Sequence, residues 1–204
     1  MVLAVVVGVA GGLWWWESRD PLTLPASACW SLVDRSDLRA LAGDEGGTFT
    51  VWHTTGGYDD DGSRFTPGVR HQTCGVKGNQ RVLLTIDVWG MTEVFFHGEY
   101  ELGHRPARAD PERQLDLGPD LKTWVAGGAV RLAFRCDNLV TREQGVVALE
   151  IWVQEDGRIS GVKSAAAQQA RLDIALRVAK KSAEWSLPCL NKVTFPDRAT
   201  APPL

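Results

Sequence analysis

An uncharged apolar run at the start of the chain places the strongest constraint on how the rest can fold and where it can reside. Residues 2–16 contain no charged side chain and close with three consecutive tryptophans, Trp14 to Trp16. A membrane-spanning helix needs about 20 apolar residues, with a lower limit of about 17, and tryptophan favours the membrane–water interface. We therefore expect residues 1–16 to be a single transmembrane helix that anchors the chain in the cell membrane, with the rest outside the cytoplasm. Because no basic residue precedes the run, we also expect the natural start to lie upstream.

Two alternatives compete with the anchor: a cleaved signal peptide and a buried segment of a soluble fold. Cleavage has one candidate site, the small residues Ala26-Ser27-Ala28, but charged residues separate it from the apolar run. The same residues followed by Cys29 resemble a lipoprotein signal only faintly, because Ala26 stands where that signal has leucine, and we expect no lipidation. Residues 17–28 contain two prolines that prevent a continuous helix, so we expect a tether there.

Four cysteines follow the apolar run, at Cys29, Cys74, Cys136 and Cys189. An even number beyond a membrane anchor indicates two disulfides in an oxidising, extracytoplasmic compartment. No two of them have C-x-x-C spacing, so an all-thiolate zinc site is a weak alternative, and four buried free thiols are another. We expect no metal site and no cofactor.

Composition bounds the remainder of the chain. Residues 29–191 are enough for one domain with a hydrophobic core. The formal net charge of the chain is −3, which gives no electrostatic reason to expect nucleic acid or anionic lipid as a partner. The sequence leaves the oligomeric state open.

The hydrophobic pattern predicts both strands and helices. Helical spacing predicts a short helix over residues 29–43, where Asp34 can serve as a cap, and a long helix over residues 164–186, which Ser164 can cap. Alternation of apolar and polar residues predicts strands at 47–53, 69–76, 81–89, 129–136 and 146–154. We therefore expect an α+β fold, with helices packed on an antiparallel sheet.

The order of these elements indicates one domain built from two similar halves, about residues 29–104 and 120–191. The segment 105–119 between them is polar and rich in turn residues. After the domain, residues 192–204 should form a flexible tail.

Each half contains one cysteine at a helix end and one in a strand. This order favours the disulfides Cys29–Cys74 and Cys136–Cys189. The competing arrangement, Cys29–Cys189 with Cys74–Cys136, would require the two helix ends to meet and the two cysteine-bearing strands to be neighbours.

The sequence contains no recognisable catalytic motif. The patterns G-x-S-x-G and H-E-x-x-H do not occur, and Ser160-Gly-Val-Lys163 lacks the companion motifs of serine–lysine hydrolases. The acidic run Asp59-Asp60-Asp61 lacks the glutamate of a calcium loop, and the stretch from His97 to His104 is more typical of a polar surface hairpin. Residues distant in sequence could still come together in a catalytic site. The candidate side chains for such a site are His53, His71, His97, Asp87 and Glu99.

Tryptophans on or near the predicted strands are a second kind of candidate site. These are Trp52, Trp89, Trp124 and Trp152. If several lie on the face away from the core, the resulting aromatic patch would favour an interface with a partner; if all are buried, they are only large core residues.

The stretch Cys29-Trp-Ser-Leu32, followed by Asp37-Leu38, Leu41 and a strand cysteine at Cys74, resembles secreted actinobacterial envelope proteins. The resemblance covers mainly residues 29–89. Many of those proteins are lipoproteins, and this chain departs from them because no lipobox lies near its apolar run. The resemblance implies a location in the cell envelope and supplies no site residues.

These features together favour a non-catalytic envelope module that is held in the membrane by residues 2–16 and binds a protein or a cell-wall component. An accessory subunit of a membrane complex is the first alternative, and a hydrolase is a weaker one.

Overall fold

A computed structural model of the chain describes residues 21–44, 46–55, 71–78, 81–91, 113–126, 128–137, 148–155, 164–184 and 189–203. The expected anchor at residues 1–16 lies outside these ranges. Among the helices within them, none combines the length and the apolar character that crossing a membrane requires.

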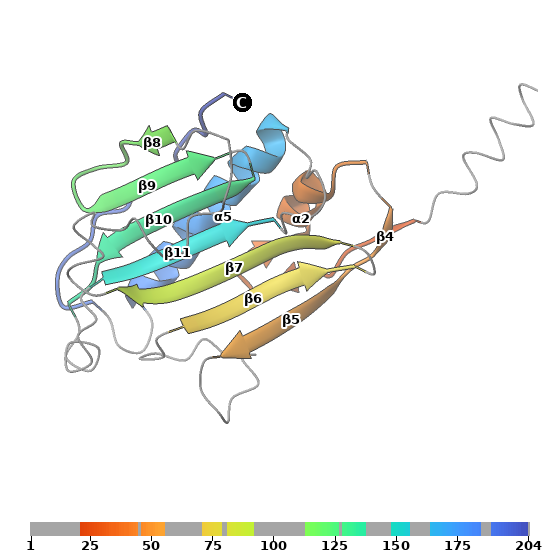
Figure 1. Ribbon diagram of the computed structural model, residues 1–204, viewed down its shortest axis with the longest axis horizontal. Coiled ribbons are helices and arrows are strands. Elements are labelled where there is room, and N and C mark those ends of the chain that lie inside the picture. Colours follow the sequence, from red (N-terminus) through yellow and green to blue (C-terminus); the bar gives the residue numbers. More distant parts are fainter. Residues whose placement is uncertain are drawn as a thin grey trace, which may run out of the picture.

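A seven-stranded antiparallel sheet forms the body of the protein, in the order β5-β6-β7-β11-β10-β9-β8 (Figure 1). The strands are β5 (Thr50–Thr55), β6 (His71–Lys77), β7 (Val82–Met91), β8 (Arg113–Leu115), β9 (Leu121–Ala126), β10 (Ala129–Arg135) and β11 (Ala148–Gln154). The sheet therefore consists of two meanders, β5-β6-β7 and β8-β9-β10-β11, which join where β7 pairs with β11. The expected antiparallel α+β architecture is confirmed.

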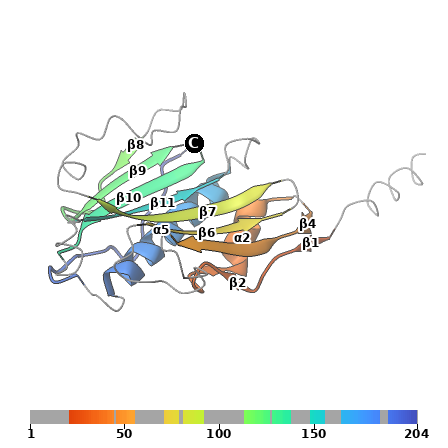
Figure 2. The ribbon, with the colours of Figure 1, turned by 60° about the horizontal axis from the view of Figure 1, so that its bottom comes forward.

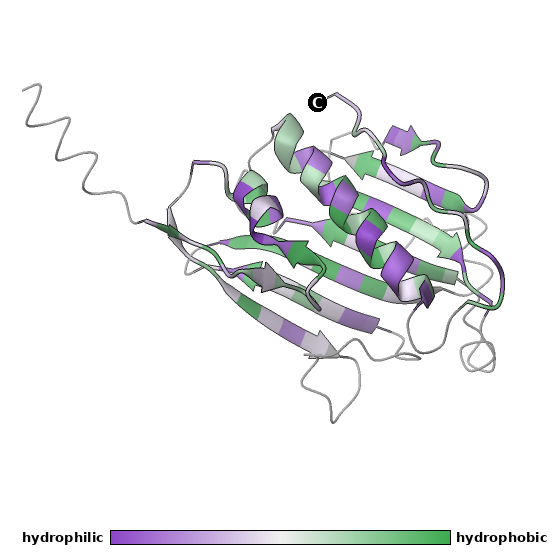
Figure 3. Cartoon of the chain, turned by 180° about the vertical axis from the view of Figure 1, so that it is seen from behind, coloured by the Kyte–Doolittle hydropathy of each residue, from purple (hydrophilic) through white to green (hydrophobic). Residues whose placement is uncertain are grey.

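Both described helices cover the same face of the sheet, as Figures 1 and 3 show from opposite sides. α5 (Ala165–Glu184) packs on β10 and β11, while α2 (Arg35–Ala42) packs on β7 and on α5. Helix residues such as Leu38, Leu172 and Ile174 are fully buried against the strand residues that alternate toward them. The core lies between helices and sheet, and burial of this apolar area is the main stabilising term.

The sequence pattern does not predict the strands β8 and β9. β8 lies in the segment expected to be a turn-rich junction, and β9 follows it directly. In β9, Leu121, Thr123 and Val125 are all buried on the helix side. The polar Thr123 interrupts the apolar alternation, which conceals the strand in the sequence.

Both helix caps occur where the sequence predicts them. The Asp34 carboxylate accepts hydrogen bonds from the backbone N–H groups of Ser36 and Asp37, and the Asp37 side chain accepts one from the Asp34 N–H in return. The pKa of Asp34 is lowered, chiefly because the Ser36 hydroxyl donates to its carboxylate. At the start of α5, the Ser164 hydroxyl accepts from the N–H of Ala167 at 3.1 Å.

The first helix nevertheless begins later than expected. Cys29, Trp30 and Ser31 have φ values of 48°, 59° and 63°, so they form a left-handed turn rather than a helical start. Such a conformation costs roughly 1–2 kcal/mol per residue, and surrounding structure must hold it. Here a disulfide holds Cys29, and the Trp30 ring lies 6.2 Å from the ring of His53.

Both predicted disulfides, Cys29–Cys74 and Cys136–Cys189, are confirmed, with Cα–Cα distances of 5.4 and 4.8 Å. Each joins one meander to a segment beside a helix: Cys74 lies in β6 and Cys136 directly follows β10, while Cys29 precedes α2 and Cys189 follows α5. Two disulfides indicate an oxidising environment outside the cytoplasm.

The segment expected to be a tether is partly integrated into the domain. β1 (Leu22–Thr23) pairs in parallel with β4 (Gly47–Thr48), and β2 (Ser27–Ala28) pairs with β3 (Val33–Asp34) (Figure 2). Leu24 is buried in the core. Backbone pairing thus fixes the later part of residues 17–28, which proline content alone does not reveal.

The C-terminal segment is also held against the core, unlike the flexible tail expected at residues 192–204. The Phe195 ring makes an edge-to-face contact with Phe134 at 5.2 Å. The Gln169 amide of α5 donates to the carbonyl of Ala199 and accepts from the N–H of Ala201. Side-chain contacts from distant elements hold this stretch, so its local composition predicts the wrong behaviour.

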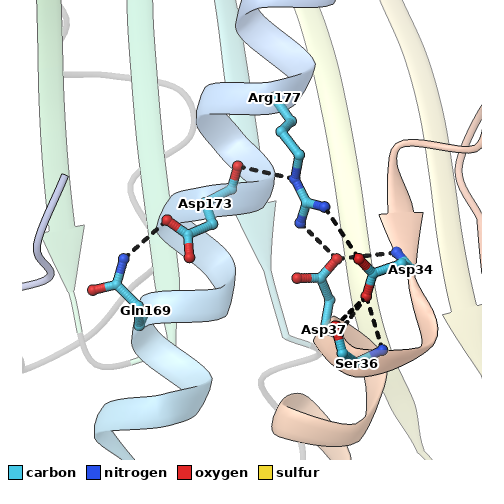
Figure 4. A network of polar contacts seen from close by, with 6 residues as sticks. All are labelled: Asp34, Ser36, Asp37, Gln169, Asp173 and Arg177. Carbon is cyan, nitrogen blue, oxygen red and sulfur yellow. Dashed lines mark hydrogen bonds and ion pairs between the residues drawn. The ribbon is translucent and has the colours of Figure 1, made fainter. Parts of the chain in front are cut away.

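Polar contacts also join the two helices (Figure 4). Arg177 of α5 lies between Asp34 and Asp37 at the start of α2 and forms ion pairs with both. Its positive charge therefore sits among the carboxylates that cap α2, and it fixes the N-terminal end of α2 against α5.

A second ion-pair cluster is buried where α5 meets the sheet. The Glu155 carboxylate pairs with Arg81 at 3.0 Å and with Arg171 at 2.8 Å, and all three side chains are almost fully buried. Burial lowers the pKa of Arg171, and the negative charge of Glu155 opposes that shift. Arg81 also donates to the carbonyl of Leu41, so the cluster links α2, α5 and the sheet.

Candidate functional site

The face of the sheet away from the helices carries all four of the candidate tryptophans, Trp52, Trp89, Trp124 and Trp152. Side chains alternate along each strand, so residues next to helix-facing core positions point to the opposite face. Ile151 and Val153 are core residues, which turns Trp152 between them away from the helices. The same alternation applies to the other three indoles. We call this surface the open face, because no described helix lies on it.

Strand register aligns these side chains across the whole sheet. One line of paired residues crosses all seven strands: Thr54, Thr73, Asp87, Trp152, Arg131, Trp124 and Gln114. Directly paired side chains lie about 4.5–5.5 Å apart at Cβ and can interact. Aromatic and hydrogen-bonding groups therefore alternate along the middle of the open face.

A polar cluster surrounds Asp87 on this face. Its Oδ1 accepts a hydrogen bond from the Thr73 hydroxyl at 2.6 Å and lies 3.1 Å from Nε2 of His71. Its Oδ2 receives a longer bond of 3.4 Å from the Gln154 amide. The imidazole of His71 stacks on Trp89, with ring centroids 3.6 Å apart. The cluster thus combines a carboxylate and an aromatic face on β7, an imidazole and a hydroxyl on β6, and an amide on β11.

The geometry of the cluster differs from that of a catalytic triad. In a triad, one imidazole nitrogen faces the nucleophile while the other is oriented by a carboxylate. Here the same atom, Nε2 of His71, lies near both the Thr73 hydroxyl, at 2.9 Å, and Asp87. The Thr73 hydroxyl already donates to Asp87, so the imidazole is not placed to activate it.

Three of the five side chains that could supply a hydrolase site are described, and of these His71 and Asp87 meet. His53 lies on the helix side, paired across from Cys74. The other two, His97 and Glu99, are outside the described residues.

The other end of the open face is cationic and aromatic. The Arg131 guanidinium lies 4.2 Å from the centre of the Trp124 ring, a cation–π contact. Arg131 also forms an ion pair at 3.0 Å with Glu150, whose side chain is 2% exposed. Lys122 follows on the same face of β9 and Arg135 on the same face of β10.

At the β5 edge, the indole of Trp52 lies over the neighbouring strand. A Cβ added to Gly75, its direct partner on β6, would sit 2.4 Å from Nε1 and Cε2 of the ring. No other residue type fits there without displacing the indole. Gly75 therefore allows Trp52 to lie along the sheet instead of projecting from it, as aromatic residues often do over a strand glycine.

Within the described ranges, no group of three or more His, Cys, Asp or Glu side chains is arranged to hold a metal ion. The acidic run at residues 59–61 and the stretch from His97 to His104 fall outside those ranges. The same is true of Ser160-Gly-Val-Lys163.

Comparisons with protein-family models, curated proteins and solved structures found no significant match to this chain. Its function must therefore be inferred from its own residues.

The sequence identifies the tryptophans and the pair of His71 and Asp87 as candidates but does not place them together. Their proximity depends on the register between β6 and β7, which pairs His71 with Trp89 and Thr73 with Asp87. Sequence reasoning missed Gln154 as a site residue and assigned Arg131 to a solvated strand face rather than to a binding site, because a polar residue on a strand is ordinarily a solvated one.

Proposed function

We propose that this chain is a non-catalytic module of the cell envelope, anchored in the membrane by residues 2–16, which binds a protein or a cell-wall component through the open face of its sheet. The observation that carries the proposal is the placement of Trp52, Trp89, Trp124 and Trp152 on one face, among hydrogen-bonding groups. Tryptophan and arginine contribute a large share of binding energy at interfaces.

Two further observations support it. The disulfides fit a domain that works outside the cytoplasm. The helix face is covered by α2, α5 and the C-terminal segment, whereas on the opposite face Trp52, Trp89 and Trp124 are partly exposed and Trp152 is buried.

The binding test is capture from envelope extracts and sedimentation with purified cell wall. The oxidised full chain should retain an envelope component, and Trp124→Ala combined with Arg131→Ala should reduce retention by about tenfold or more. Lys180→Ala on α5 serves as the control, because it alters the opposite side of the molecule. Equal retention by all three proteins, or none by any, would contradict the proposal.

The membrane topology has its own test. Protease added to intact cells should remove the domain, since residues after the anchor would face outward. Digestion only after lysis would overturn this topology and leave the binding proposal to be judged by the capture experiment.

A further inference from the structure

We infer that the half of the open face formed by β5, β6, β7 and β11 is a subsite for a neutral saccharide. The inference rests on the proposed function and deepens it, because it commits this part of the face to an uncharged, polyhydroxylated segment of a glycan. The subsite is made of the two central lines of paired residues on these four strands, together with His71 and Trp89.

Register defines the subsite. In one line, Trp52 pairs with Gly75, followed by Thr85 and Gln154 on β7 and β11; in the next, the order is Thr54, Thr73, Asp87 and Trp152. Neighbouring strands are about 4.8 Å apart, so Trp52 and Trp152 stand roughly three strand spacings from each other. Between the two indoles lies a strip of hydroxyl, amide and carboxylate groups.

The charge of this strip favours an uncharged ligand. Among the described residues of the two lines on these strands, Asp87 is the only charged side chain. Its carboxylate already lies against His71 and accepts from Thr73, which reduces its attraction for a cation. Lys122, Arg131 and Arg135 lie at the other end of the open face, the last two in ion pairs with Glu150 and Asp137. Lys77 also lies on this face, at the end of β6 and outside the two lines.

The side-chain chemistry favours a sugar over a protein. The two lines contain no aliphatic side chain on these strands, whereas the centre of a protein interface is typically apolar. A pyranose presents C–H groups on its faces, which pack on an indole, and hydroxyls at its rim, which need donors and acceptors. The indole of Trp52, which lies over Gly75, offers the aromatic surface for the C–H groups. Thr85, Asp87 and Gln154 offer donors and acceptors for the hydroxyls.

Asp87 is the residue best suited to orient the ligand. Its Oδ1 is occupied by His71 and Thr73, while Oδ2 receives only the 3.4 Å contact from Gln154. That oxygen can accept a sugar hydroxyl, and a carboxylate acceptor makes a stronger hydrogen bond than a neutral one. Its side chain is 12% exposed, so the bond would form at a largely desolvated position.

The experiment is a titration of the oxidised full chain with chitohexaose, cellohexaose and a mannose hexamer, followed by tryptophan fluorescence and calorimetry. We expect at least one of them to bind with a Kd of about 1 mM or below. Trp52→Ala should weaken that binding about tenfold, and Trp52→Phe should restore most of it. Asp87→Asn should also weaken it, because the amide replaces one carboxylate oxygen with a donor.

Lys180→Ala is the control, since Lys180 lies on α5, on the other side of the sheet from the subsite. It should leave oligosaccharide affinity within about twofold. Thermal unfolding of every variant separates loss of binding from loss of folding, and Trp52→Phe keeps the test valid if Trp52→Ala unfolds.

The outcomes also separate this inference from the proposed function. If none of the oligosaccharides binds at about 10 mM, or if Trp52→Ala binds as well as the unaltered chain, the saccharide subsite is wrong. If the oligosaccharide result is negative but the chain retains an envelope protein through Trp124 and Arg131, the proposed envelope function is supported and only the saccharide subsite is rejected. If oligosaccharides bind but no envelope component is retained, the saccharide subsite is supported and the proposed envelope function is rejected.

Discussion

The two faces of the sheet differ in chemistry although the same strands form both. The helix face is aliphatic and closed: Leu172, Ile174 and their strand partners are inaccessible to solvent. The open face alternates indoles with hydrogen-bonding and charged groups, many of them partly exposed. We therefore expect a change on the helix face to unfold the protein, and, under the proposed function, a change on the open face to alter binding first.

The largest expected effect is a charge placed on the helix face. Leu172→Asp buries a carboxylate without a partner and should destabilise the fold by about 4 kcal/mol or more. Thr54→Asp puts the same group at an exposed position of the open face and should cost less than about 1 kcal/mol. Chemical denaturation of both variants measures the difference. Equal losses of stability would show that the helix face and the open face tolerate an added carboxylate equally well.

Disulfide removal should have the next largest effect and should differ between the two meanders. Replacing either pair by alanine should cost about 2–5 kcal/mol. We expect the Cys29–Cys74 pair to cost more, because both of its cysteines are buried and it also holds the left-handed turn at residues 29–31. Urea denaturation of the two double variants checks this order, and a larger loss for Cys136–Cys189 would reverse it.

A methyl group at Gly75 tests how tightly the open face is packed at its β5 edge. Gly75→Ala would place Cβ 2.4 Å from the Trp52 ring and should destabilise by about 1–3 kcal/mol. The double variant with Trp52→Ala should recover part of that loss, because the clash disappears. If the losses of stability caused by the two substitutions simply add, the position of the Trp52 ring does not depend on the glycine at position 75.

The cap of α2 provides a smaller, pH-dependent effect on the helix side. Asp34→Ala should cost about 1 kcal/mol at neutral pH. Because folding lowers the pKa of Asp34 below its ordinary value of 3.8, its contribution is present above that pH and is lost as the pH falls through the folded-state pKa. The stabilities of the two proteins should therefore converge as the pH falls below 3.8, and a difference that does not shrink with falling pH would assign the effect to something other than the carboxylate.

The smallest expected effect comes from removing the cation–π contact at the cationic end of the open face. A double-mutant cycle on Arg131 and Trp124 should give a coupling energy of about 0.5–1 kcal/mol. Arg131→Lys is the informative single variant, since lysine keeps the charge but not the planar group. A coupling energy near zero would show that the contact does not stabilise the fold.

Much of the secondary structure could be predicted because it depends on neighbours in sequence. The long helix follows from the spacing of Leu172, Leu176 and Ala179 together with the Ser164 cap, and β7 follows from the alternation of Leu84, Ile86 and Val88. The wrong predictions occur where local signals are weak. The left-handed turn after Ala28 and the packed C-terminal segment are held by contacts with distant residues, and no local pattern encodes them.

By itself the sequence determined the α+β class, both disulfide pairs, the caps at Asp34 and Ser164, and the set of tryptophans that could form a site. Alternation and capping are short-range effects, and each disulfide links two cysteines of the same half of the chain, 45 or 53 residues apart. Only the tertiary structure decided that β7 pairs with β11, and with it that Asp87 lies beside Trp152 and that the four indoles share one face. The physical reason is register: a shift of one residue between strands would turn every side chain of a strand to the other face, and only packing of the whole core selects among the possible registers.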